Sequence, residues 1–214
     1  MIIIQSIISF ILHIDEHLVE IIQNFGIWTY VILFLIVFVE TGLVIFPFLP
    51  GDSLLFASGA LAAMEALNIV ILLLVFFVAA VIGDTVNYHI GKKVGMSIPP
   101  NSLLGKVINQ EKMQKAEEFF NKHGGQTIVI ARFMPFIRTF APFIAGASRM
   151  NYRYFILYNI VGAALWVSIC TMAGYFFGNM KIVKENFSTV ILLIIFLSIL
   201  PAIISIVKNR ITKK

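Results

Sequence analysis

The sequence is poor in charged residues and has almost no cysteine. Of its 214 residues only 13% are Asp, Glu, Lys or Arg, whereas 59% are hydrophobic, and the mean hydropathy is +0.94. Soluble globular domains carry roughly 25% charged residues, so the composition excludes an ordinary soluble domain and predicts a polytopic membrane protein. The single cysteine, Cys170, excludes an intrachain disulfide, and its apolar neighbours predict a packing residue.

Positive charge is absent from the first part of the chain. No Lys or Arg precedes Lys92, whereas basic residues cluster between Lys92 and Arg153 and again in the C-terminal tail. Because the N-terminal apolar stretch has no basic region, it does not predict a cleavable signal peptide. The positive-inside rule predicts that the loop at 92–125 and the C-terminus are cytoplasmic. Membrane topology thus explains the basic residues, which do not indicate a nucleic-acid partner.

The residue patterns of common catalytic sites are also missing. The sequence has no Gly-rich phosphate-binding loop and no pair of histidines near its arginines, as a lipid phosphatase would need. His13 to His17 matches the H-x-x-E-H zinc-protease pattern. A match of five residues often arises by chance, and the polar face of an interfacial helix explains it better. We therefore expect no enzyme activity, no metal and no cofactor.

The most unusual stretch of the chain runs from Glu40 to Asp52. It places two carboxylates in a strongly apolar region, with the helix breakers Pro47, Pro50 and Gly51 between them. A charged side chain in hydrocarbon costs several kcal/mol, so intramembrane acids are candidates for functional residues. Broken backbone persists at membrane depth only where protein buries it or where it lines a cavity.

A second broken stretch, at 127–147, carries basic instead of acidic residues. Arg132 and Arg138 surround Pro135, and Pro142 follows them. We expect both prolines to break the helix. Basic residues flank this stretch on both sides, so it is expected to enter from the cytoplasm and to return there.

These segments predict an all-helical polytopic membrane protein that forms one domain over residues 1–214. The arms on either side of the prolines are shorter than the roughly 20 residues of a full crossing, which favours re-entrant hairpins. The expected elements are an interfacial helix at 1–26, a re-entrant hairpin at 27–65, a transmembrane helix at 66–91, a cytoplasmic loop with an amphipathic helix at 92–125, a second re-entrant hairpin at 126–148, and transmembrane helices at 151–180 and 186–207.

An internal repeat supports this layout. Landmarks of the first transmembrane helix recur 83 residues later: Asn68, Gly91 and Gly95 are matched by Asn151, Gly174 and Gly178. The helix at 66–91 would run inward and the helix at 151–180 outward, so we expect two inverted repeats, each made of a hairpin and a transmembrane helix. Secondary transporters are often built in this way, with sites near the membrane midplane at discontinuous helices.

The two hairpins carry opposite charges that suit a common site. Arginine forms bidentate hydrogen bonds with phosphate and stays charged when partly desolvated, so Arg132 and Arg138 are candidate ligands for a phosphate headgroup. Burial favours the neutral form of a carboxyl group and a nearby arginine favours the charged form, so Glu40 and Asp52 are candidates for proton coupling. The alternative is that the four charges only neutralise each other and hold the hairpins together.

Asp84 is a secondary candidate for the same site. It shares a helix face with Tyr88, Gly91 and Gly95. Small residues at this spacing are more often used for close helix packing than for chemistry.

Three ordered motifs resemble those of a known family: ETGLVIFPFLPGDSLLFASG at 40–59, GDTVNYHIG at 83–91 and RFMPFIRTFAPFIAG at 132–146. Together they closely resemble the DedA family of bacterial inner-membrane proteins, which share the VTT (SNARE-associated) domain. The resemblance implies lipid transport linked to the proton motive force, with undecaprenyl phosphate moved by some members and phosphatidylethanolamine by others. It also implies functional acids at Glu40 and Asp52 and functional arginines at Arg132 and Arg138.

The favoured function is therefore a flippase for a phosphate-bearing lipid, with undecaprenyl phosphate as the first choice, in a bacterial inner membrane and with protons as coupled partners. Phosphatidylethanolamine or another phospholipid is an alternative substrate, moved by a flippase or a scramblase. Two further alternatives are a proton-coupled antiporter of a small cation or drug and a non-transporting scaffold for membrane assembly. A homo-oligomer is compatible with the sequence.

Overall fold

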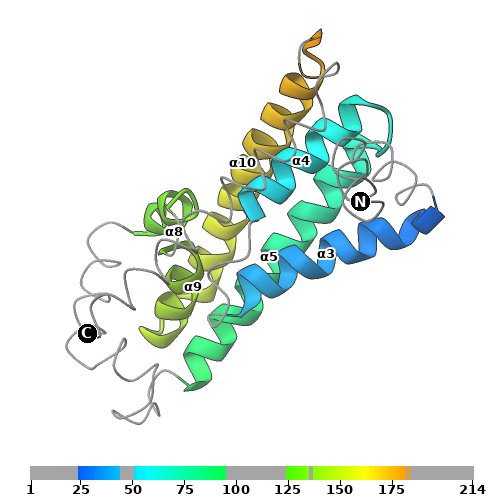
Figure 1. Ribbon diagram of the computed structural model, residues 1–214. Helices are drawn as coiled ribbons and strands as arrows, with labels where there is room; N and C mark the ends of the chain where they lie inside the picture. The colour runs from blue at the N-terminus through cyan, green and yellow to red at the C-terminus, as the bar shows by residue number, and fades with distance from the viewer. Residues whose placement is uncertain (1–23, 44–50, 95–123, 135–136, 182, 184–214) are drawn as a thin grey trace, which may run out of the picture. The chain divides into compact units, whose positions relative to one another are not determined.

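The computed structural model describes residues 24–43, 51–94, 124–134, 137–181 and 183. These residues are helical apart from turns, and no strand occurs among them (Figure 1). The helices are α3 (Ile27–Gly42), α4 (Gly51–Ala63), α5 (Ile69–Val94), α8 (Gln126–Ala131), α9 (Ile137–Ala147) and α10 (Tyr152–Gly178). The prediction of an all-helical chain is confirmed for this part of the sequence.

Two of these helices are long and apolar enough to cross a membrane. The helix α5 has 26 residues and α10 has 27, which gives each a length of about 40 Å, more than the roughly 30 Å of a hydrocarbon core. They cover most of the predicted spans at 66–91 and 151–180. Leu74, Val78 and Ile82 of α5 follow each other at helical spacing and are exposed, as expected of a surface that faces lipid.

Several predicted features lie outside the described residues. They are most of the interfacial helix at 1–26, the amphipathic helix within 92–125 and the transmembrane helix at 186–207, together with Pro47, Pro50 and Pro135. All of these stay predictions. Gly51, the last expected breaker of the first hairpin, is the first residue of α4.

The prediction that Pro142 breaks a helix is wrong. It lies inside α9, which continues to Ala147. Only one turn of α9 precedes Pro142, so the missing N–H group and the steric effect of the ring are confined to that turn. The helix break in this region is therefore the gap between α8 and α9, which pack against each other.

The chain divides into two compact units. The first unit comprises Met1–Ile32, Pro50–Leu74 and Ser168–Lys214, and the second comprises Leu33–Leu49 and Val75–Val167. The second unit contains all of α8 and α9, whereas α4 belongs to the first unit, and α3, α5 and α10 contribute to both. The single membrane domain expected from the sequence stays a prediction.

In the second unit, glycines let α9 pack directly on the backbone of α5. A Cβ atom at Gly146 would overlap the carbonyl oxygen of Tyr88, and a Cβ atom at Gly91 would overlap the carbonyl oxygen of Phe143. Any larger residue at either position would force the two helices apart. This close packing fixes α9 against the C-terminal part of α5, next to Asp84 and Asn87 of the candidate site.

The first unit contains a contact of the same kind between α4 and α10. A Cβ atom at Gly59 would overlap the carbonyl oxygen of Thr171, and a Cβ atom at Gly174 would overlap that of Phe56. Gly59 and Phe56 precede their counterparts Gly146 and Phe143 by 87 residues, whereas Gly174 and Thr171 follow Gly91 and Tyr88 by 83 residues. The two units thus use glycines in the same way.

The turns that follow α4 and α9 are also alike. Glu65 and Arg149 adopt positive φ values of 64° and 56°, a conformation that commonly ends a helix. Asn68 then caps α5, because its Oδ1 atom accepts hydrogen bonds from two backbone N–H groups at the start of that helix. Asn151 stands at the same place before α10 and accepts from the N–H group of Arg153 at 2.9 Å.

Candidate functional site

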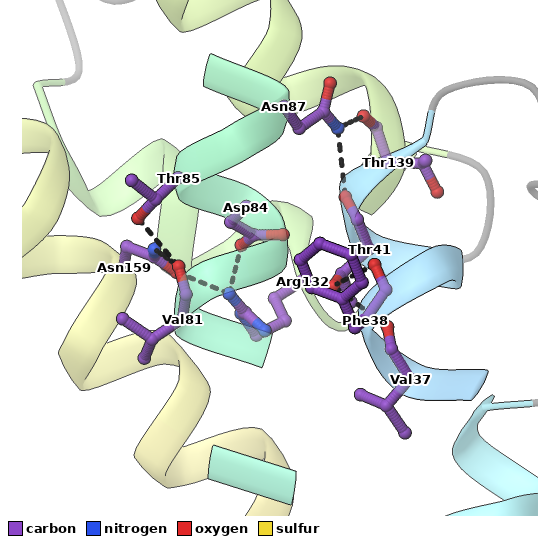
Figure 2. Close-up of polar contacts among 10 residues, drawn as sticks. All are labelled: Val37, Phe38, Thr41, Val81, Asp84, Thr85, Asn87, Arg132, Thr139 and Asn159. Carbon is purple, nitrogen blue, oxygen red and sulfur yellow. Dashed lines mark hydrogen bonds and ion pairs between the residues drawn. The ribbon is translucent and has the colours of Figure 1, made fainter. Parts of the chain in front are cut away.

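Arg132 lies at the end of the short helix α8 and is buried, with 4% of its surface exposed. Its Nη2 atom donates to Asp84 of α5, with which it forms an ion pair, and to the Oδ1 atom of Asn159 of α10 at 2.6 Å (Figure 2). Gly162, one turn after Asn159, leaves room for this side chain, because a Cβ atom there would lie 3.4 Å from Arg132 Nε. Three helices therefore determine where this guanidinium points.

A second ion pair joins Arg138 and Glu40. Arg138 is in the first turn of α9 and Glu40 is in the last turn of α3, where 1% of the Glu40 surface is exposed. The Nη2 atom of Arg138 donates to the Oε1 atom of Glu40. The sequence places these residues in different hairpins, and the structure brings them together.

Both arginines also contact Trp166 of α10. The guanidinium carbons of Arg132 and Arg138 lie 5.6 and 5.3 Å from the centre of the Trp166 rings. The negative face of an aromatic ring attracts cations, and the attraction is stronger where water is excluded. Trp166 is 1% exposed, so it offers both positive charges a favourable surface in a place that water does not reach freely.

Asn87 joins α5 to the two helices that carry Glu40 and Arg138. Its Nδ2 atom donates to the carbonyl oxygens of Thr41 at 3.1 Å and of Thr139 at 2.7 Å (Figure 2). The last carbonyl groups of a helix have no partner within that helix, and an unpaired carbonyl group is unfavourable at membrane depth. The fully buried Asn87 thus satisfies the end of α3 and holds it beside α9.

A small cavity adjoins these residues. It has about 10 Å³ of space for the centre of a water-sized molecule, which is roughly enough for one water. The residues that line it are Glu40, Thr41, Asp84, Ile128, Arg132, Arg138, Thr139, Pro142 and Trp166. A phosphate group is larger than one water, so the cavity in this structure is too small to hold one.

The structure assembles three of the four principal site residues predicted from the sequence. Glu40, Arg132 and Arg138 lie around the cavity in the second unit. Asp52 belongs to the first unit, in the first turn of α4, and its side chain is exposed. Its role in proton coupling stays a prediction.

Asp84 has a larger part in the site than its secondary rank suggested. It is 4% exposed and is the ion-pair partner of Arg132, which the sequence had matched with acids of the first hairpin. The sequence predicted close helix packing on the face of α5 that carries Asp84, and Gly91 on this face does pack closely against α9. The same face also carries the acid, so the two interpretations are compatible.

Sequence reasoning missed the uncharged residues of the site. Asn87, Asn159 and Trp166 all lie in long apolar helices, where hydropathy gives them no weight. A signal was available in the sequence: Asn87 and Asn159 are polar residues within long apolar stretches. Polar side chains in membrane helices usually face the protein interior and form hydrogen bonds there. Among the described residues, no cluster of three or more His, Cys, Asp or Glu could hold a metal ion.

Comparison with known proteins identifies the family. Residues 49–176 match the VTT domain. Over 211 residues the chain is 50% identical to Protein DedA of Escherichia coli K12, an alignment that covers 97% of this chain and 95% of that protein. This chain belongs to the DedA family of membrane proteins.

Two further relatives have lower identity and shorter alignments. An uncharacterized membrane protein of Mycobacterium leprae is 46% identical over 172 residues, which cover 79% of this chain and 76% of that protein. Inner membrane protein YqjA of Escherichia coli K12 is 39% identical over 150 residues, which cover 70% of this chain and 68% of that protein. No solved structure matches the chain. The VTT match includes Asp84, both arginines and Trp166, whereas Glu40 precedes it.

Proposed function

We propose that this DedA-family protein is a flippase for a phosphate-bearing lipid in the bacterial inner membrane, with undecaprenyl phosphate as the favoured substrate. Arg132 and Arg138 bind the phosphate, and Glu40 and Asp52 couple its movement to protons. The observation that carries this proposal is the pair formed by the buried Arg132 and the largely buried Arg138, which line one cavity. Protons and the lipid phosphate are its partners, and the protein transports its substrate without a chemical reaction.

The choice of a phosphate ligand follows from the chemistry of the two guanidinium groups. Each presents a planar set of N–H donors that matches the oxygens of a phosphate. Two such groups contact the ring of Trp166 and line one cavity, so they bring donors and positive charge to a small volume. A site for a cation or a cationic drug would instead be expected to leave its acids without arginine partners.

The alternative is that the ion pairs only hold the helices together, and this alternative explains fewer features of the site. Apolar residues of similar size often replace a buried ion pair without loss of stability. Two adjoining pairs that border a cavity are better explained by a ligand that exchanges with the acids.

We further propose that α3 with α4 and α8 with α9 form re-entrant hairpins, and that the two repeats are inverted. The helices α8 and α9 have 6 and 11 residues, so they extend about 9 and about 16 Å, far less than a bilayer core. The matching glycine contacts and helix ends of the two units support the repeat. In this topology the C-terminus is cytoplasmic, which agrees with the prediction of the positive-inside rule.

The test is transport of a labelled lipid in proteoliposomes. The purified full chain should move labelled undecaprenyl phosphate between leaflets faster than empty vesicles do, and a proton gradient should change the rate. Arg132→Ala should abolish the movement. Arg153→Ala is the matched control, because Arg153 is exposed at the start of α10, and it should transport at the normal rate.

The same vesicles distinguish the substrates. Movement of labelled phosphatidylethanolamine but not of the polyprenyl phosphate would assign the protein to phospholipids. Equal movement of either lipid by the Arg132→Ala protein would contradict the role of the arginines.

A further inference from the structure

A phosphate can bind the edge of a guanidinium group that carries the Nε and Nη2 atoms, and in Arg132 only Nη2 of this edge has hydrogen-bond partners in the described part of the chain. A bidentate contact on this edge uses the Nε and Nη2 atoms together. In the structure Nη2 donates to Asp84 and Asn159, whereas Nε has no hydrogen-bond acceptor among the described residues although it is buried. A phosphate oxygen could reach Nε directly, but the second oxygen would compete with Asp84 for Nη2.

The charged residues around the cavity determine what must happen when a phosphate displaces Asp84 from Arg132. Arg132 of α8 and Arg138 of α9 contribute two positive charges, and Asp84 of α5 and Glu40 of α3 contribute two negative charges. The neighbouring part of α10 contributes only the uncharged Asn159 and Trp166. The described site is therefore neutral before a ligand enters.

A bound phosphate would add negative charge to this neutral, buried site. Uncompensated charge is strongly unfavourable in such surroundings. A proton on the displaced carboxyl group would restore neutrality, and the new O–H group could donate to the phosphate.

We propose that Asp84 holds Arg132 in place of the substrate phosphate, and that the phosphate displaces Asp84, which then takes up a proton from water. This inference rests on the proposed function and deepens it. Asp84 is then a positioning residue for Arg132 and takes up a proton when phosphate binds, in addition to the coupling roles proposed for Glu40 and Asp52.

Calorimetry of ligand binding tests this exchange. The probe is dioctyl phosphate, because a phosphodiester carries one negative charge at neutral pH and does not itself take up a proton. It is titrated into the detergent-solubilised full chain in two buffers with different enthalpies of ionisation. The difference between the two binding enthalpies gives the number of protons taken up, which we expect to be about one per bound phosphate for the unmodified protein.

The variant Asp84→Asn separates Asp84 from the other acids. It removes the competitor and leaves a positive site, so we expect the probe to bind about tenfold more tightly, without proton uptake and with little dependence on pH. Glu40→Gln should still take up a proton through Asp84. Glu65→Gln, which changes an exposed acid of the first unit, should behave as the unmodified protein does.

The outcomes separate this inference from the proposed function. Failure of the unmodified protein to bind the probe would overturn both. Binding without proton uptake, or an Asp84→Asn protein with unchanged affinity and unchanged proton uptake, would overturn only the role of Asp84. If Asp84→Asn does not fold, the proton count of the unmodified protein and of Asp84→Glu, which should retain the uptake, decides the question.

Discussion

Arg132 and Arg138 approach the same indole ring although two guanidinium groups repel each other. Each arginine has its own acid, Asp84 or Glu40, and the face of Trp166 attracts both cations. The removal of one member of a buried ion pair typically costs about 3–5 kcal/mol, because the other charge stays buried without compensation. Substitutions that keep the charge are therefore the most informative.

The Arg138→Lys protein should fold and should transport its lipid more slowly. Lysine keeps the positive charge beside Glu40, but it lacks the planar set of donors that binds a phosphate in a bidentate manner. We expect the transport rate in proteoliposomes to fall about tenfold, which corresponds to about 1.4 kcal/mol. Arg153→Lys is the control on the exposed start of α10. A normal rate for Arg138→Lys would show that only the charge of this residue matters.

Trp166→Leu should weaken phosphate binding and should also lower the stability of the protein, because leucine leaves a cavity where the buried indole lies. Leucine keeps an apolar side chain at the position but has no aromatic face, so each arginine loses about 0.5–2 kcal/mol of attraction. We expect a several-fold weaker affinity for dioctyl phosphate by calorimetry. Trp28→Leu, at an exposed position of α3, provides the comparison. Equal affinities of the two variants would contradict a role of Trp166 at the site.

At the scale of elements, α9 is the part of the site that is held most closely. Its glycine contact fixes it on α5, and Asn87 connects it to the end of α3. Neither interaction involves charge, so the stability of the protein reports on both directly.

Asn87→Leu should destabilise the protein. The side chains are similar in size, but leucine leaves the carbonyl oxygens of Thr41 and Thr139 without this donor. A buried polar group that loses its partner costs about 1–3 kcal/mol, which thermal unfolding in detergent would measure. Asn179→Leu removes a hydrogen bond of the same kind, from Asn179 Nδ2 to a backbone carbonyl, at an exposed position. A similar loss of stability in both variants would argue against a special role for Asn87.

Gly146→Ala should separate α9 from α5. The added methyl group would overlap the carbonyl oxygen of Tyr88, and such overpacking typically costs about 1–3 kcal/mol. Unfolding and transport should both be affected, because the shift would also move Arg138. Gly42→Ala is the matched control, since its new Cβ atom would lie 3.4 Å from the nearest atom, an ordinary contact.

The sequence predicts the charged half of this site well and the rest poorly. Glu40, Arg132 and Arg138 are conspicuous because charge is rare in apolar stretches. The pairing of Arg132 with Asp84 depends on how α8 packs against α5, across 48 residues of sequence, and no local pattern reports it. Pro142 was misjudged for a related reason, because a proline breaks a helix only where the surrounding structure does not accommodate it.

At the scale of the whole chain, the proposed inverted repeats require the turns after α4 and α9 to face opposite sides of the membrane. Glu65 and Arg149 occupy corresponding positions in these turns, and both are exposed. The positive-inside rule predicts that the Arg149 turn is cytoplasmic, and the proposed topology then places the Glu65 turn outside.

Labelling of single cysteines tests this topology. In a Cys170→Ala background, Glu65→Cys should react with a membrane-impermeant maleimide added to intact cells, whereas Arg149→Cys should react only after lysis. Equal labelling of both variants in lysed cells is the control for reactivity. Labelling of both from the same side would contradict the inverted repeat.

The small volume of the cavity has an electrical consequence. A hydrated ion carries several water molecules, and the space beside the arginines admits about one. Both guanidinium groups are also engaged by carboxylates, so the cavity that the described residues line has no room for a hydrated ion. In this conformation an ion would have to shed most of its water to enter the cavity, so the described part of the site favours electrical insulation over conduction.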